Sequence, residues 1–174
     1  MKLLVIRHAR AESAKEFAKT GANDDLRPLT TDGRERMRLG AAGLHRLVDA
    51  IDLLATSPLV RARQTADIVA AEYDAQIVEA AVLRPETPPD ALGSWLKDAG
   101  ARETVAVVGH NMHLSEFVGW LLTGEPEAIV EIKKGAAVLL VLRARNGPHG
   151  RPWHAQLLWS LSPQQLRMLR PAQR

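Results

Sequence analysis

Three short apolar runs constrain the fold of this chain most strongly, and polar residues follow each of them at once. The runs are Leu3-Leu4-Val5-Ile6, Leu53-Leu54-Ala55 and Val105-Ala106-Val107-Val108. Continuous apolar runs of this length are typical of strands that are buried on both faces of a parallel sheet. Parallel strands end at the same edge, where open α/β sheets bind their ligands. The sequence therefore predicts that Arg7-His8, Thr56-Ser57-Pro58 and Gly109-His110 meet at one edge.

Helical patterns alternate with these runs along the chain. Helices are predicted over about residues 32–50, 59–73, 90–99, 112–123 and 163–169, with a weaker strand near 76–78. Two further strands, over 136–142 and 154–161, flank a Gly/Pro-rich turn at 146–150 and are predicted to pair antiparallel at a sheet edge. Residues 11–32 lack periodicity and are predicted to form a loop with one helical turn near 14–19.

The alternation predicts an α/β fold, namely a single-domain three-layer α/β/α sandwich with a mostly parallel central sheet. We expect one domain over residues 1–174, without a large cap insertion. Asp32, Ser57 and Asn111 are each predicted to cap the helix that follows, with Pro58 in the first turn of its helix.

Composition and charge exclude several classes of protein. The chain has no cysteine, which removes disulfides, thiol nucleophiles and thiolate metal sites. Its six histidines show no tight ligand spacing, so no metal site is expected. A net charge of only +3 argues against nucleic-acid binding, and no apolar stretch approaches the roughly 18 residues of a membrane span. We expect a cytoplasmic monomer or weak dimer whose substrate is anionic.

The predicted edge carries residues that suit phosphoryl transfer. Such chemistry needs a nucleophile with a free lone pair and fixed positive charge around the non-bridging oxygens. Arg7 and Arg61 supply planar donors that stay protonated, and their charge should lower the pKa of a neighbouring imidazole. Either His8 or His110 can be the nucleophile on these grounds, because spacing does not choose between them.

Four blocks of the sequence resemble the histidine phosphatase superfamily, also called the phosphoglycerate mutase-like family. The blocks are Leu4-Val5-Ile6-Arg7-His8-Ala9, Arg27-Pro28-Leu29-Thr30 with Gly33, Ser57-Pro58-Leu59-Val60-Arg61-Ala62-Arg63-Gln64-Thr65-Ala66, and Val108-Gly109-His110-Asn111. Their order and separation agree with the family. Their compact spacing is most similar to its small bacterial phosphohistidine phosphatase branch, the SixA type.

The resemblance implies a role for each residue of the edge. His8 would be the nucleophile that becomes phosphorylated, Arg7 and Arg61 would clamp the phosphate, and His110 would bind it and steady the transition state. No metal or organic cofactor is implied. The larger members carry a glutamate that protonates the leaving oxygen, and Glu86 is the nearby candidate here, although its surroundings do not match that block.

The poor match around Glu86 favours one substrate class over the others. Phosphohistidine leaves as an imidazole, which is a far better leaving group than an alkoxide, so a dedicated acid is less needed. The sequence thus predicts a phosphatase for phosphohistidine, in a protein such as a phosphorelay domain. Two alternatives stay open: a phosphomonoesterase or mutase for sugar or nucleotide phosphates, and a non-catalytic module that binds phosphate.

The remaining polar residues receive plainer interpretations. The hydroxyl of Ser57 and the amide of Asn111 can also touch phosphate, while Arg63 faces elsewhere. Arg10 and Arg27 are interpreted as solvated surface residues near the entrance. The four other histidines are assigned structural or surface positions. They are His45, His113, His149 and His154.

Overall fold

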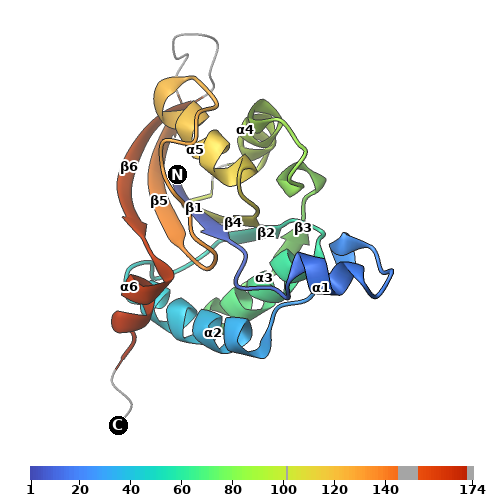
Figure 1. Cartoon of the computed structure of the whole chain (residues 1–174). Helices are drawn as coiled ribbons and strands as arrows, with labels where there is room; N and C mark the ends of the chain where they lie inside the picture. Colours follow the sequence, from blue (N-terminus) through green and yellow to red (C-terminus); the bar gives the residue numbers. More distant parts are fainter. Residues whose placement is uncertain (101, 145–152, 172–174) are drawn as a thin grey trace.

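The computed structural model describes residues 1–100, 102–144 and 153–171, and the strands in these ranges form one six-stranded sheet (Figure 1). Its strand order is β3-β2-β4-β1-β5-β6. The parallel strands are β1 (Lys2–Arg7), β2 (Leu53–Thr56), β3 (Ile77–Glu79) and β4 (Thr104–Gly109). The antiparallel pair is β5 (Ala137–Ala144) and β6 (Trp153–Leu161). The predicted α/β class and the edge pair are confirmed, whereas the turn at 146–150 lies outside the described residues.

Helices cover both faces of the sheet and make the three predicted layers (Figure 1). One face packs against α2 (Thr31–His45), α3 (Val60–Tyr73) and α6 (Pro163–Met168), and the other against α4 (Pro89–Asp98) and α5 (His113–Thr123). A hydrophobic core lies on each face of the sheet, and the side chains of β1 alternate between them. Leu3 and Val5 pack on the side of α4 and α5, and Leu4 and Ile6 pack on the other side. None of the helices in the described ranges has the length and apolar content that crossing a bilayer would require.

The segment 11–32 holds more structure than the predicted single turn. α1 (Ala14–Ala18) confirms the expected helical turn, and a 3₁₀ turn, η1 (Asp24–Leu26), follows it. A second 3₁₀ turn, η2 (Ala81–Leu83), lies after β3. The η1 turn packs near α3, so it reaches the edge at which β1, β2 and β4 end.

The predicted caps of α2 and α3 are wrong. The hydroxyl of Thr30, not the carboxylate of Asp32, accepts a hydrogen bond from the Gly33 amide at 2.9 Å and caps α2. Helix α3 begins at Val60, after an N-cap without a side-chain hydrogen bond, so Ser57 does not cap it and Pro58 precedes its first turn. Ser57 is therefore free for another role.

Helices α2 and α6 touch backbone to backbone at a glycine. A Cβ placed on Gly43 would lie 1.8 Å from the carbonyl oxygen of Leu166 in α6. The α2 helix tolerates no side chain there. One turn earlier the packing is looser, because a Cβ on Gly40 would meet only the Cβ of Leu166, at 3.9 Å.

We expect the substitution Gly43→Ala to lower the free energy of unfolding by about 2 kcal/mol, because the added methyl forces α6 to shift. Gly40→Ala is the matched control on the same helix. It should leave stability unchanged or raise it by about 0.5–1 kcal/mol, since a helical glycine is removed without a clash. Urea denaturation measures both, and equal stabilities of the two variants would contradict this packing.

Candidate active site at the carboxyl edge of the sheet

Backbone hydrogen bonds continue past the ends of β1 and β2 and bring their polar residues together. Arg7 pairs with Gly109 in the last register of β1 and β4. Beyond it, the amide of His8 donates to the Gly109 carbonyl at 2.9 Å, and the amide of Ser57 donates to the Val108 carbonyl at 2.9 Å. The predicted meeting of these strand ends at one edge is thus confirmed.

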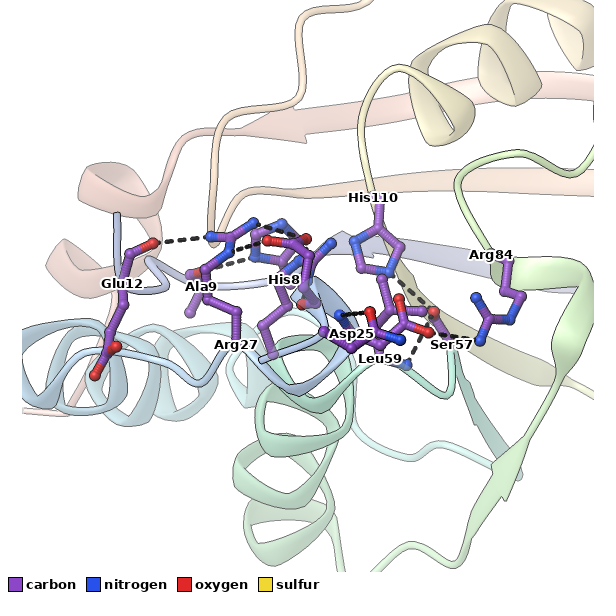
Figure 2. A network of polar contacts seen from close by, with 12 residues as sticks. His8, Ala9, Glu12, Asp25, Arg27, Ser57, Leu59, Arg84 and His110 are labelled. Carbon is purple, nitrogen blue, oxygen red and sulfur yellow. Dashed lines mark hydrogen bonds and ion pairs between the residues drawn. The ribbon is translucent and has the colours of Figure 1, made fainter. Parts of the chain in front are cut away.

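The imidazoles of His8 and His110 lie next to each other at this edge (Figure 2). Their ring centroids are 5.1 Å apart and the rings are tilted by 52°. Both residues are buried. Nδ1 of His8 lies 2.7 Å from the carbonyl oxygen of Ala9, which can only accept, so Nδ1 carries the proton. In the neutral ring this leaves the lone pair on Nε2.

Ser57 contacts the second imidazole. Its Oγ lies 2.9 Å from Nε2 of His110 and also accepts a weak hydrogen bond, at 3.4 Å, from the amide of Leu59. Ser57 is fully buried, and its side chain fixes the orientation of the His110 ring. In the described part of the chain, Nδ1 of His110 is buried and has no hydrogen-bond partner.

Burial keeps both imidazoles neutral at physiological pH. The pKa of His8 is lowered from 6.5 to about 3, mainly by desolvation and also by the nearby charges of Arg61 and Arg7, while the hydrogen bond to the Ala9 carbonyl acts in the opposite direction. Desolvation likewise lowers the pKa of His110 to about 2, with added repulsion from His8 and Arg61. A neutral imidazole is the form that can act as a nucleophile.

The charges of the two predicted arginines act on both imidazoles. Nη1 of Arg7 donates to the Ile132 carbonyl at 2.8 Å, and Nη1 of Arg61 donates to the Asp24 carbonyl at 2.9 Å. Burial lowers the pKa of each guanidinium, but arginine stays protonated in proteins. Among the described residues, Nε of Arg7 and Nε of Arg61 are buried without a partner, so each keeps a donor for an anion.

Thr65 connects the nucleophile loop to the arginine helix, a role that the sequence did not reveal. Its buried hydroxyl accepts from the Ala9 amide at 3.0 Å and donates to the Arg61 carbonyl at 2.7 Å. The residue therefore ties the backbone after His8 to the first turn of α3. The sequence signal for this role is the spacing of Thr65, which lies one helical turn after Arg61 near the start of the predicted helix.

Lys134 is a further cation that the sequence interpretation missed. It precedes Gly135, whose amide donates to the carbonyls of Arg7 and His8 at 3.1 Å. Burial lowers the pKa of Lys134, and the charges of Arg7 and other arginines of the edge lower it further. The positive φ of 78° at Gly135 turns the chain toward the site and is a feature that only a structure displays.

The η1 turn places carboxylates against the arginines. Oδ2 of Asp24 lies 3.2 Å from Nη1 of Arg61, and Asp25 pairs with Arg84 at 2.9 Å (Figure 2). Arg27 binds Asp24 at 2.7 Å and its side chain is only 12% exposed, so its interpretation as a solvated surface residue is wrong. The segment 11–32 therefore reaches Arg61 of α3 through Asp24 of η1.

Glu86, the predicted proton donor, lies at the rim. Its carboxylate is 3.4 Å from Nη1 of Arg84 and the side chain is 64% exposed. Burial lowers the pKa of His113, and the negative charge of Glu86 acts in the opposite direction. His113 is 1% exposed, so it is a buried residue of α5. The position of Glu86 does not match a buried general acid.

Asn111, the other residue predicted to touch phosphate, does not cap α5 as expected. Met112 occupies the N-cap position, without a side-chain hydrogen bond. Oδ1 of Asn111 is buried without a partner in the described ranges, one residue after His110.

The remaining predicted positions lie at the surface. Arg63 pairs with Glu79 at 2.6 Å, away from the histidine pair. The Arg10 side chain is 67% exposed, and His154 is exposed on β6. His45 of α2 contacts Glu72 of α3, and its ring packs against that of Tyr73 at a tilt of 33°. His149 lies outside the described residues. Within those residues, no three His, Asp or Glu side chains gather as a metal ion would require.

Comparisons with known proteins agree with this arrangement. A family model described as the histidine phosphatase superfamily (branch 1) matches residues 3–85. An uncharacterised protein of Picosynechococcus sp. is 32% identical over 143 residues, which cover 79% of this chain and 83% of that protein. The mitochondrial serine/threonine-protein phosphatase Pgam5 of Drosophila willistoni is 30% identical over 161 residues, which cover 75% of this chain. The chain spans about half the length of that relative, 53%.

The solved structures show the same fold. The protein histidine phosphatase SixA complexed with tungstate superposes with a TM-score of 0.76. The match covers 95% of this chain and 99% of that chain, at 24% sequence identity.

We expect Asp24→Asn to strengthen the binding of inorganic phosphate about fivefold, because the anion then no longer competes with a carboxylate for Arg61. An exposed ion pair is worth up to about 1 kcal/mol, which sets this magnitude. Asp67→Asn, which removes a carboxylate 3.3 Å from Arg63 on the outer side of α3, is the matched control. Titration calorimetry measures the two dissociation constants. Unchanged or weaker binding by Asp24→Asn would show that Asp24 does not compete.

Proposed function

The chain belongs to the histidine phosphatase superfamily, and from this premise we propose that it hydrolyses phosphoryl groups through a covalent intermediate on His8. One observation carries the proposal. Two buried imidazoles, 5.1 Å apart and kept neutral by desolvation, share one strand edge with two guanidiniums that each keep an unpartnered Nε–H donor among the described residues.

The hydrogen bonds of the two rings favour His8 over His110 as the nucleophile. The Ala9 carbonyl holds the proton of His8 on Nδ1, so Nε2 presents its lone pair to a phosphorus atom. Nε2 of His110 already contacts Ser57, and its Nδ1 is buried. His110 therefore fits better as a group that binds the phosphoryl oxygens.

In the first step, Nε2 of His8 forms a bond to phosphorus while the bond to the leaving group breaks and its electron pair departs with that group. Negative charge then lies on the three non-bridging oxygens. Arg7 and Arg61 offer donors to these oxygens, and His110 completes the cradle. The hydrogen bonds of Thr65 keep Arg61 at a fixed place relative to the His8 loop.

In the second step, water attacks the phosphorus of phosphorylated His8. A phosphorus–oxygen bond forms, the bond to Nε2 breaks, and its electron pair returns to Nε2, so the ring, which keeps its proton on Nδ1, is neutral again. The proton that water loses passes to a phosphate oxygen or to solvent, and inorganic phosphate departs. The low pKa of His8 matches this cycle, because a free ring that stayed protonated could not accept the next phosphoryl group.

Phosphohistidine in a protein is the substrate that we propose. A phosphoramidate expels a nitrogen base, which needs less help from an acid than an alkoxide does. The exposed position of Glu86, with Arg84 beside it, supports a site without a strong buried acid. The rival reading is a phosphomonoesterase or mutase for small metabolites, and it requires Glu86 to protonate an oxygen leaving group.

The test compares hydrolysis of a phosphohistidine peptide, a phosphoserine peptide, and a panel of sugar and nucleotide phosphates. We expect kcat/KM to be highest for the phosphohistidine peptide. On that substrate, His8→Ala should lower kcat by at least about a thousandfold and Arg61→Ala by about a hundredfold or more. His154→Ala, which alters an exposed histidine of β6, is the matched control and should keep wild-type turnover.

The other outcomes decide against parts of the proposal. Full turnover by His8→Ala would exclude His8 as the nucleophile. A clear preference for a sugar or nucleotide phosphate, lost in Glu86→Gln, would favour the metabolite enzyme. Binding of phosphate without release from any donor would favour a binding module.

A further inference from the structure

A basic pocket lies beside the candidate active site and is lined by residues of α2, of α6 and of the segment before β5. Its volume is about 430 Å³. Five cationic side chains line this cavity, which we therefore call the basic pocket. They are Arg10, Arg36, Lys133, Lys134 and Arg167. Within the described chain, its lining includes no aspartate or glutamate.

The basic pocket adjoins the loop that follows His8. Ala9 and Gly135 belong to its lining, and Ala9 directly follows His8. The amide of Gly135 donates to the carbonyl of His8. A substrate that places its phosphoryl group against His8 therefore has the basic pocket beside it. No step of the proposed reaction uses these cations, apart from the contribution of Lys134 to the charge near His8.

The charge of the basic pocket is only partly balanced. Asp32 lies 2.6 Å from Arg36 and 3.7 Å from Arg10, and Glu131 lies 3.6 Å from Lys133. In the described ranges, Lys134 and Arg167 have no ion-pair partner. Five cations against two neighbouring carboxylates leave a local excess of three, on a chain whose whole net charge is +3. The positive charge is therefore concentrated on this face.

The character of the lining indicates what kind of anion it receives. The side chains of Arg10, Arg36 and Lys133 are 67%, 56% and 62% exposed. Such solvated cations attract and orient a charged surface, whereas a site for one small anion uses buried, fixed donors. In the described chain the lining has no aromatic side chain on which a nucleic-acid base could stack. An acidic protein segment fits these features best.

We propose that the basic pocket binds an acidic segment of the protein that carries the phosphohistidine, and so selects the substrate. This inference rests on the proposed phosphatase function and adds a docking site to it. The attraction between exposed charges acts over about 10 Å at 0.1 M salt, so it raises the rate of productive encounter and weakens as salt increases.

The test uses two synthetic peptides with the same phosphohistidine. One has four glutamates next to the phosphohistidine in its sequence, and the other has four glutamines at the same positions. We expect the wild type to have a kcat/KM about tenfold higher for the acidic peptide in 50 mM salt, with most of the difference lost at 300 mM. Phosphoramidate, which has no peptide, reports the chemical step alone.

The decisive variant is Arg36→Glu/Arg167→Glu, which reverses two cations of the basic pocket that lie outside the proposed chemistry. It should lose the preference for the acidic peptide and keep wild-type turnover of phosphoramidate. Arg38→Glu/Lys97→Glu makes the same charge change on other surfaces, on α2 and α4, and should retain the preference. Circular dichroism confirms that both variants are folded.

Several results would overturn the docking proposal. They are equal kcat/KM for both peptides in the wild type, an unchanged preference in Arg36→Glu/Arg167→Glu, an equal loss in the control, and tighter binding of single-stranded DNA than of the acidic peptide at the same salt. An equal loss on phosphoramidate would place the two arginines in the chemistry instead. If the wild type released no phosphate from either peptide or from phosphoramidate, the proposed function itself would fail.

Discussion

The rest of the site depends on the backbone ladder that aligns the carboxyl ends of β1, β2 and β4. Because the His8 amide bonds to the Gly109 carbonyl and the Ser57 amide to the Val108 carbonyl, residues far apart in sequence are held together at one edge of the sheet. The buried apolar strands make that ladder rigid. These hydrogen bonds position the side chains that follow the strands. The place where the strands end therefore determines which reactive groups lie together.

Burial at this edge creates the reactivity and also the need for counter-charges. The same desolvation that keeps His8 and His110 neutral makes the nearby guanidiniums costly to leave unpaired. Asp24 offsets that cost by pairing with Arg61. Farther out, Arg10, Arg36 and Lys133 of the basic pocket are exposed to solvent, where they can meet a charged surface.

Much of the fold and the center of the site could be predicted from the sequence, because both follow from local patterns. The apolar runs set the strands, and His8, Arg61 and His110 lie at fixed short distances from strand ends. What could not be predicted depends on contacts between distant segments. Asp24 reaches Arg61 only because η1 packs near α3, and the burial of Arg27 has the same cause. The cap predictions failed for two reasons. Thr30 caps α2 in place of the nearby Asp32, whereas α3 and α5 begin after Leu59 and Met112, which make no side-chain capping hydrogen bond.

The most direct test of the central claim is to trap the phosphorylated chain. After rapid mixing with radiolabelled phosphoramidate and quenching in alkali, the protein should retain label that is stable in base and lost in acid, and peptide mapping should place it on His8. A label that survives acid, or one that maps to His110 or Ser57, would contradict the account.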